Sequence, residues 1–129
     1  MPRGTIIRDA HFPGRAPIDA YGNGGFRFAD MSHRGSILCL PSGIYGWPAA
    51  SFGDIDEQAL ARVFAEADEI DILLVGAGSS PGRLEQRLHA RLRGASISAD
   101  AMSTGAAVRT YNVLLAEERL VAAALIAVD

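Results

Sequence analysis

The segment IDILLVGAGSSPGRLEQRLHARLRG, residues 70–94, decides the fold that we predict for this chain. It starts with a nearly continuous apolar run that ends at Gly76, a pattern typical of a strand buried on both faces of a sheet. Ser80 and Pro81 suit the N-cap and first position of a helix. Leucines at every fourth position then give that helix an apolar face that ends near Gly94. We therefore expect a strand, a glycine-rich loop and a helix, with any small-molecule site near the loop.

The rest of the second half repeats this alternation of helix and strand. Asp54 and Glu57 have the spacing of a capping box, which predicts an earlier helix that begins at Asp54. A strand is expected over residues 95–101, and Thr104 suits the N-cap of a third helix. The final apolar run, residues 120–128, is predicted to be a central strand. This order indicates βαβ units with at least one parallel crossover.

The first half has the pattern of an antiparallel β section with many turns. Short strands are expected over residues 18–21, 26–31, 37–40 and 44–47, with a hairpin turn at residues 33–36. Residues 1–17 contain three prolines and are predicted to form an irregular arm with a strand fragment at residues 5–7. The fold class is therefore α/β (α+β mixed). We expect residues 1–129 to form a single three-layer domain with a mixed sheet packed by helices.

Composition limits the classes of function. The chain has 129 residues, 49% of them apolar, and a net charge of −3, which argues against a general nucleic-acid-binding surface. No apolar run reaches the ~20 residues that span a bilayer, and no signal peptide is visible, so a cytoplasmic protein is expected. The single cysteine, Cys39, lies in an apolar run and is predicted to be a buried strand residue. No spacing typical of a metal site, cofactor fingerprint or catalytic set is present.

Two glycine- and hydroxyl-rich segments are the candidate ligand site. Gly76, Gly78, Ser79 and Ser80 follow the first strand, and Ser103 and Thr104 precede the third helix. If the two strands are parallel, both helix N-termini open on one edge of the sheet, where a small anion or polar ligand can bind. The same residues also suit a tight strand-to-helix turn and ordinary helix capping.

Two further groups are candidate contact surfaces. Arg83, Arg87 and Arg91 are spaced four residues apart and are predicted to form a basic ridge, which could meet an acidic partner or serve only as a solvated helix face. Tyr45 and Trp47 form an aromatic cluster, which suits either an interface anchor or the end of the core.

Several segments together resemble one known family. They are IDAYG (18–22), GFRF (25–28), LP (40–41), GW (46–47), LLVGAG (73–78), MSTGAAVRTYN (102–112) and EERLVAAAL (117–125). They resemble the small Mth-type domain family of unknown function, which includes the mitochondrial assembly factor 3 for NADH:ubiquinone oxidoreductase and an adipogenesis-associated branch. The resemblance implies a three-layer domain with a mixed sheet and no established enzyme activity. It gives weight to Thr104, Tyr111 and Asn112 as a shared feature, and on this ground Tyr111 and Asn112 are included among the candidate ligand-binding residues.

Two hypotheses of function remain open at this stage. The first is a non-enzymatic protein without cofactors that acts through protein contacts and assists the assembly of a membrane complex, such as a respiratory one. The second is a small-ligand or anion-binding protein, or an unrecognised enzyme, with its site between the loop at residues 76–80 and the helix start at Ser103 and Thr104. A homo-oligomer that uses the aromatic cluster near Trp47 is a third, weaker alternative.

Overall fold

The computed structural model describes residues 12–129. Most of the expected arm, and its strand fragment at residues 5–7, lie outside the described residues. The described end of the arm is not irregular throughout, because Phe12–Pro13 form a short strand that pairs with residues 43 and 44.

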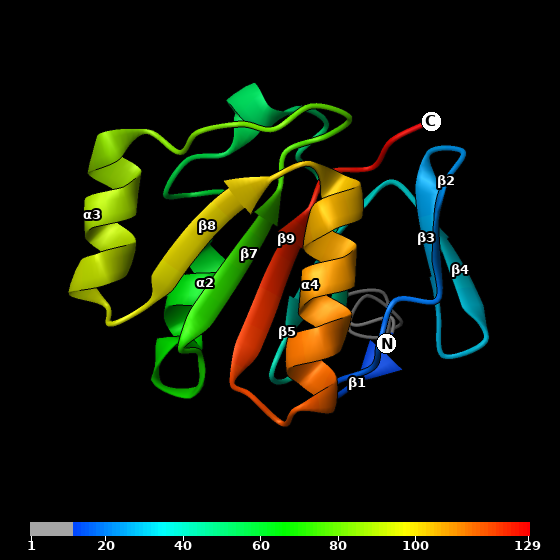
Figure 1. Cartoon of the computed structure of the whole chain (residues 1–129). Coiled ribbons are helices and arrows are strands. Elements are labelled where there is room, and N and C mark those ends of the chain that lie inside the picture. Colours follow the sequence, from blue (N-terminus) through cyan, green and yellow to red (C-terminus); the bar gives the residue numbers. More distant parts are fainter. Residues whose placement is uncertain (1–11) are drawn as a thin grey trace, which may run out of the picture.

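Six strands form the main sheet (Figure 1), in the order β1 (Phe12–Pro13), β6 (Gly43–Trp47), β5 (Ser36–Leu40), β9 (Val121–Leu125), β7 (Ile72–Gly76) and β8 (Ser98–Met102). β9 is antiparallel to β5 and parallel to β7, and β7 is parallel to β8. The sheet is therefore mixed, antiparallel in its first half and built from βαβ units in its second. The C-terminal apolar run contributes a central strand, as predicted.

Helices cover both faces of this sheet and make a three-layer domain. α4 (Thr104–Ala116) packs on β7 and β9, whereas α2 (Ala61–Ala65) and α3 (Gln86–Gly94) cover the other face (Figure 1). The side chains of β7 alternate between the two resulting cores, so that Leu73 and Val75 face α2 and α3 while Leu74 faces α4. Burial on both faces explains why this strand is apolar almost throughout.

A second, three-stranded sheet packs beside the first, in the order β2 (Ala20–Gly22), β3 (Gly25–Phe28) and β4 (Met31–Arg34). Here the predicted strand over residues 26–31 is interrupted. Ala29 and Asp30 both have positive φ, 49° and 63°, which matches the tight turn of a two-residue hairpin. The expected turn at residues 33–36 is replaced by the end of β4 and a single glycine, Gly35, that leads into β5.

The predicted starts of two helices are wrong. Residues 52–54 form a short 3₁₀ turn, η1 (Phe52–Asp54), in which the Asp54 carboxylate accepts hydrogen bonds from the amides of Ala50 and Ser51. A second 3₁₀ turn, η2 (Ala67–Glu69), follows α2. α3 begins at Gln86 rather than at Pro81, so the segment after β7 is a long loop. A Cβ on Gly82 would lie 2.9 Å from Ala77 and Phe52, which shows how closely this loop packs on the domain.

None of the helices within residues 12–129 is long and apolar enough to cross a membrane.

Candidate functional site

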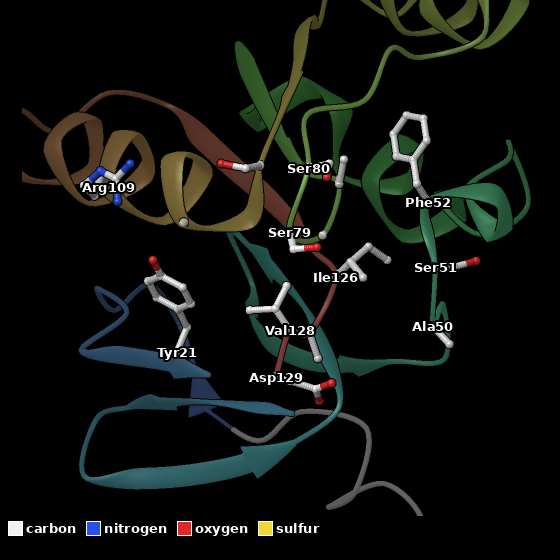
Figure 2. Close-up of a pocket in the computed structure, with 15 residues that line it drawn as sticks. Tyr21, Ala50, Ser51, Phe52, Ser79, Ser80, Arg109, Ile126, Val128 and Asp129 are labelled. Atoms are coloured by element: carbon white, nitrogen blue, oxygen red, sulfur yellow. The ribbon is translucent and has the colours of Figure 1, made fainter. Parts of the chain in front are cut away.

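The carboxyl ends of the parallel strands β7, β8 and β9 open into a pocket of about 790 Å³. Figure 2 shows Tyr21 and Arg109 on one side and Ser51 and Phe52 on the other. Ser79, Ser80 and residues 126–129 lie between these two sides. The structure therefore places a concave site where the sequence predicted one. Of the predicted ligand-binding residues, it brings Gly78, Ser79, Ser80 and Ser103 together along the lining.

Thr104 has a different role from the one predicted. Ser103 is the N-cap of α4, and its side chain accepts a hydrogen bond from the amide of Ala106. Thr104 is fully buried in the first turn, where its hydroxyl donates to the carbonyl of Ile126 at 2.7 Å and accepts from the amide of Gly78 at 3.0 Å. This hydroxyl ties together the loop after β7, the start of α4 and the end of β9. It positions the pocket without lining it.

Gly76 is also structural rather than ligand-facing. A Cβ at this position would lie 3.0 Å from both Leu125 and Thr104, so the close packing of β7 against its neighbours leaves no room for a side chain. Gly78 differs, because it lines the pocket and has a φ of +109° with open space around it. This conformation favours glycine and turns the backbone so that its amide reaches Thr104.

The start of α4 is less open to an anion than the sequence suggested. The amide of Thr104 donates to the carbonyl of Gly78 at 2.8 Å, and the amides of Ala106 and Ala107 both donate to Ser103. Three of the first amides of the helix thus have acceptors within the protein. An anion here would have fewer donors than a bare helix N-terminus provides.

Arg109 and Tyr21 are among the pocket residues that were not predicted as site residues. Arg109 is exposed on α4, four residues after Gly105, and supplies a guanidinium group to the lining. The Tyr21 ring, 42% exposed, packs so closely on Gly105 that a Cβ there would collide with its hydroxyl. The sequence does contain a signal for Arg109. This residue follows Ser103, the capping residue, and lies about one helical turn after Gly105, so its side chain lies on the same face of the helix as Gly105. Hydroxyl groups, one cation and the Asp129 carboxylate suit a small polar ligand.

Tyr111 and Asn112 were predicted to share in ligand binding, and the structure places neither in the pocket. Asn112 holds the backbone of Ile18 from both sides, accepting from its amide at 2.9 Å and donating to its carbonyl at 2.8 Å. The buried Tyr111 hydroxyl donates to the carbonyl of Ala16 at 3.3 Å. These two side chains fasten the segment before β2 onto α4.

Tyr45 and Trp47 belong to the core, which is the second of the two roles considered for them. Both are at most 9% exposed. The Trp47 indole donates to the carbonyl of Ala59 at 2.9 Å, and the Tyr45 hydroxyl contacts that of Ser42 at 2.5 Å. They close the core beneath α2 and are not available as exposed interface anchors.

The helical spacing predicted for the basic ridge holds only for Arg87 and Arg91, because α3 begins at Gln86. Arg83 precedes α3, and Arg87 is exposed. Arg91 turns toward Glu57, to which it donates two hydrogen bonds at 3.0 and 2.8 Å. Those bonds lower the pKa of Glu57 and raise the pKa of Arg91. Because both side chains are exposed, the pair adds little to stability.

Cys39 is a buried strand residue of β5, as predicted. Burial raises the pKa of its thiol from 9.0 to about 12, and a hydrogen bond with Tyr111 opposes this rise. Such a thiol stays protonated at neutral pH and is a poor nucleophile. Within residues 12–129 no group of three or more His, Cys, Asp or Glu side chains is placed to hold a metal ion.

Comparisons with known proteins show which family and which solved structures the chain is similar to. The profile described as a protein of unknown function, DUF498/DUF598, matches residues 18–126. An uncharacterized protein of Rhodobacter capsulatus is 40% identical over 92% of this chain and 90% of its own length. The NADH dehydrogenase [ubiquinone] 1 alpha subcomplex assembly factor 3 of Mus musculus is 30% identical over 93% of this chain and 65% of its own length. The Drosophila melanogaster assembly factor is 34% identical over 84% of this chain and 57% of its own length.

Solved structures agree with these matches. A crystal structure described as an outer membrane protein of Bartonella henselae has a TM-score of 0.89 and 60% identity, covering 92% of this chain and 100% of that one. A Mth938-like domain of Bordetella pertussis has a TM-score of 0.77 and 27% identity, covering 87% of this chain and 85% of its own.

Proposed function

The chain belongs to the DUF498/DUF598 family, the Mth-type domain family that includes the assembly factor 3 of NADH:ubiquinone oxidoreductase, and on this premise we propose that it acts through protein contacts to assist assembly of a membrane-bound respiratory complex. The observation that carries this proposal is the match to the assembly factors over most of this chain. The chain spans between 57 and 65% of the length of those assembly factors, so only their shared domain supports the comparison.

The internal contacts fit a domain that works through its surface. Thr104, Tyr111 and Asn112, the residues to which the family resemblance gave most weight, all hold distant parts of the chain together. They join the segment before β2, the loop after β7 and the end of β9 to a single helix, α4. Such a fixed framework suits binding of a partner with little loss of conformational entropy.

Affinity purification of the tagged full-length chain tests this function. We expect subunits of NADH:ubiquinone oxidoreductase to be enriched over a tag-only control, with wild-type protein and the exposed control variant Arg119→Ala giving the same enrichment. Failure to enrich any subunit of a respiratory complex would contradict the proposal. Three further points stay predictions. Cell fractionation tests the cytoplasmic location, a filter-binding assay tests the absence of nucleic-acid binding, and sedimentation tests the oligomeric state.

The pocket beside α4 favours a second candidate function, the binding of a small polar ligand. Its support is the concave shape at the predicted position and the convergence of Ser79, Ser103 and Arg109. A thermal-shift screen with phosphate, nucleotides and common metabolites tests it, because a ligand at a hundred times its Kd stabilises a protein by about 2.7 kcal/mol. A stabilising compound should lose its effect in Arg109→Ala and Ser79→Ala. The absence of any stabilising compound would remove this candidate.

A further inference from the structure

The two edges of the main sheet are protected very differently. β1, at one edge, has only two residues, and one of them is Pro13. β8, at the other edge, has the sequence Ser-Ala-Asp-Ala-Met over residues 98–102, with no proline and no basic residue. Natural sheets usually shield a free edge with prolines, lysines or bulges, since its unpaired backbone groups can pair with another chain. The edge of β8 has no proline and no lysine; its charged residue is Asp100, and His89 of α3 covers part of the edge at the Ala99 carbonyl.

Hydrogen bonds at both ends of β8 show which backbone groups face outward. The amide of Ser98 donates to the carbonyl of Asp71 at 2.9 Å, and the carbonyl of Met102 accepts from the amide of Ala77 at 2.7 Å. In a parallel ladder alternate residues bond to the same neighbour, so Ala99 and Ala101 direct their amides and carbonyls away from β7. The Ala99 carbonyl lies 3.3 Å from His89 Nε2.

Two hollows follow this outer edge, one on each side of His89, whose imidazole lines both. The first has a volume of about 310 Å³ and is lined mainly by Arg83, Leu84, Ala99, Asp100 and Ala101. The second, of about 340 Å³, is lined by Arg93, Ser96, Ile97 and Ser98. Both hollows border β8, the outermost strand beside α3 in Figure 1, and we treat them together as one surface. We call it the β8 trough.

Charged residues of opposite sign lie on the two faces of the sheet next to the β8 trough. Arg83 and Arg93 line the hollows beside α3, are exposed, and form no ion pair with another residue of the described chain, 12–129. Asp100 is level with Leu74, whose side chain belongs to the core under α4. Neighbours in register point to the same face of a sheet. The Asp100 carboxylate therefore belongs to the α4 face, opposite to α3.

We propose that the β8 trough binds an extended segment of a partner protein as an added strand, with acidic side chains at every second position. The backbone of that segment bonds to Ala99 and Ala101, which is the usual basis of strand addition. Its acidic side chains meet Arg83 and Arg93 on the α3 face, and its uncharged or basic side chains lie beside Asp100. His89 gives up the Ala99 carbonyl, since a 3.3 Å contact is long for such a bond. This inference rests on the proposed protein-contact function and names one surface for it.

A synthetic peptide tests the inference on the full-length protein. The probe is a peptide of alternating glutamate and threonine with blocked ends. Its length of about eight residues is usual for a strand. NMR titration with amide hydrogen exchange should show that the peptide slows exchange at Ala99 and Ala101. Ala101→Pro removes one outward amide without touching the bonds to β7, and it should weaken binding about tenfold or more. Arg83→Ala and Arg93→Ala should each weaken it about two- to fivefold, whereas Arg119→Ala, in the exposed segment between α4 and β9, should not.

Several results would overturn the inference. If wild-type protein does not bind the glutamate–threonine peptide, or binds a lysine–threonine peptide equally well, an acidic partner segment is excluded. If Ala101→Pro fails to fold, a glutamate–threonine peptide N-methylated at alternate residues gives the same test, and its equal binding would exclude strand addition. Concentration-dependent protection of Ala99 and Ala101 in the free protein would mean that a second copy occupies the edge. The titration contains no respiratory complex, so its result is independent of whether the protein assists assembly of that complex in cells.

Discussion

Replacing Thr104 by valine should destabilise the domain more strongly than its conservative chemistry suggests. Valine keeps the shape of threonine but lacks the hydroxyl. The hydroxyl of Thr104 accepts a hydrogen bond from the Gly78 amide at 3.0 Å and donates one to the Ile126 carbonyl at 2.7 Å. In the variant, the Gly78 amide and the Ile126 carbonyl lose this hydrogen-bond partner at a position where residue 104 is 0% exposed. The loop after β7 and the end of β9 then lose their shared bonds to the Thr104 side chain, while the loop keeps the backbone bond from the Thr104 amide to the Gly78 carbonyl.

The size of the effect follows from these two groups. A buried polar group without a partner costs about 1–3 kcal/mol, so the two groups together should cost about 2–6 kcal/mol. Unfolding entropy of about 2.1 cal/mol/K per residue makes each kcal/mol worth about 4 °C in Tm for a chain of this length. We therefore expect Tm to fall by about 8–24 °C. Thr104→Ser keeps the hydroxyl and loses one methyl group, so it should cost only about 1 kcal/mol.

Thermal and urea unfolding, followed by circular dichroism, measure this difference. A Thr104→Val variant within about 2 °C of wild type would refute the assignment of a structural role to the hydroxyl. Thr104→Ser as unstable as Thr104→Val would show that the methyl group, rather than the hydrogen bonds, is what matters.

Three other variants and conditions test the account. Asn112→Ala should lower the free energy of unfolding by about 1–3 kcal/mol, because the amide and carbonyl of Ile18 lose their partner, whereas Val113→Ala, at a 57% exposed position, should stay within about 0.5 kcal/mol. Gly76→Ala should cost about 1–3 kcal/mol in urea unfolding, since the added methyl would lie 3.0 Å from atoms of the adjacent strand and helix; no loss would show that the packing there is loose. Burial raises the pKa of Cys39 from 9.0 to about 12, so the folded thiol keeps its proton while the unfolded thiol ionises as pH rises above 9. Stability from this group is thus complete below pH 9 and is lost between about pH 9 and 12; near pH 10.5 the loss should be about 1–2 kcal/mol, and a Cys39→Ala variant with the same alkaline slope as wild type would contradict it.

The order of elements could be predicted from sequence because it depends on long apolar patterns. The run before Gly76 and the run at residues 120–128 are apolar since both strands are covered on two faces, and the structure places both in the centre of the sheet. Element starts were less predictable. Ser80 and Pro81 have the chemistry of a helix start, yet the close packing of Gly82 on Phe52 keeps this stretch in a loop until α3 begins at Gln86.

The candidate site was predictable in position but not in detail. Parallel strands bring the segments at residues 76–80 and 103–104 together, as expected from their place after strands. Ser103 and Thr104 are both suitable caps, and local sequence does not show that Thr104 turns inward to bonds 22 and 26 residues away. Tyr21 reaches the pocket from the three-stranded sheet, a long-range contact that no local pattern contains. The aromatic pair of β6 suited core and interface equally until its burial was known.

The amount of assembled NADH:ubiquinone oxidoreductase in a deletion strain is the measurement that decides whether this protein assists assembly of the complex. Native gels of membranes from the source organism, stained for NADH dehydrogenase activity, measure the intact complex, and re-expression of the wild-type chain serves as the control. The proposed function predicts a loss of intact complex in the deletion strain, an accumulation of partly assembled forms, and recovery on re-expression. Unchanged amounts of intact respiratory complexes in that strain would contradict an assembly role for this protein.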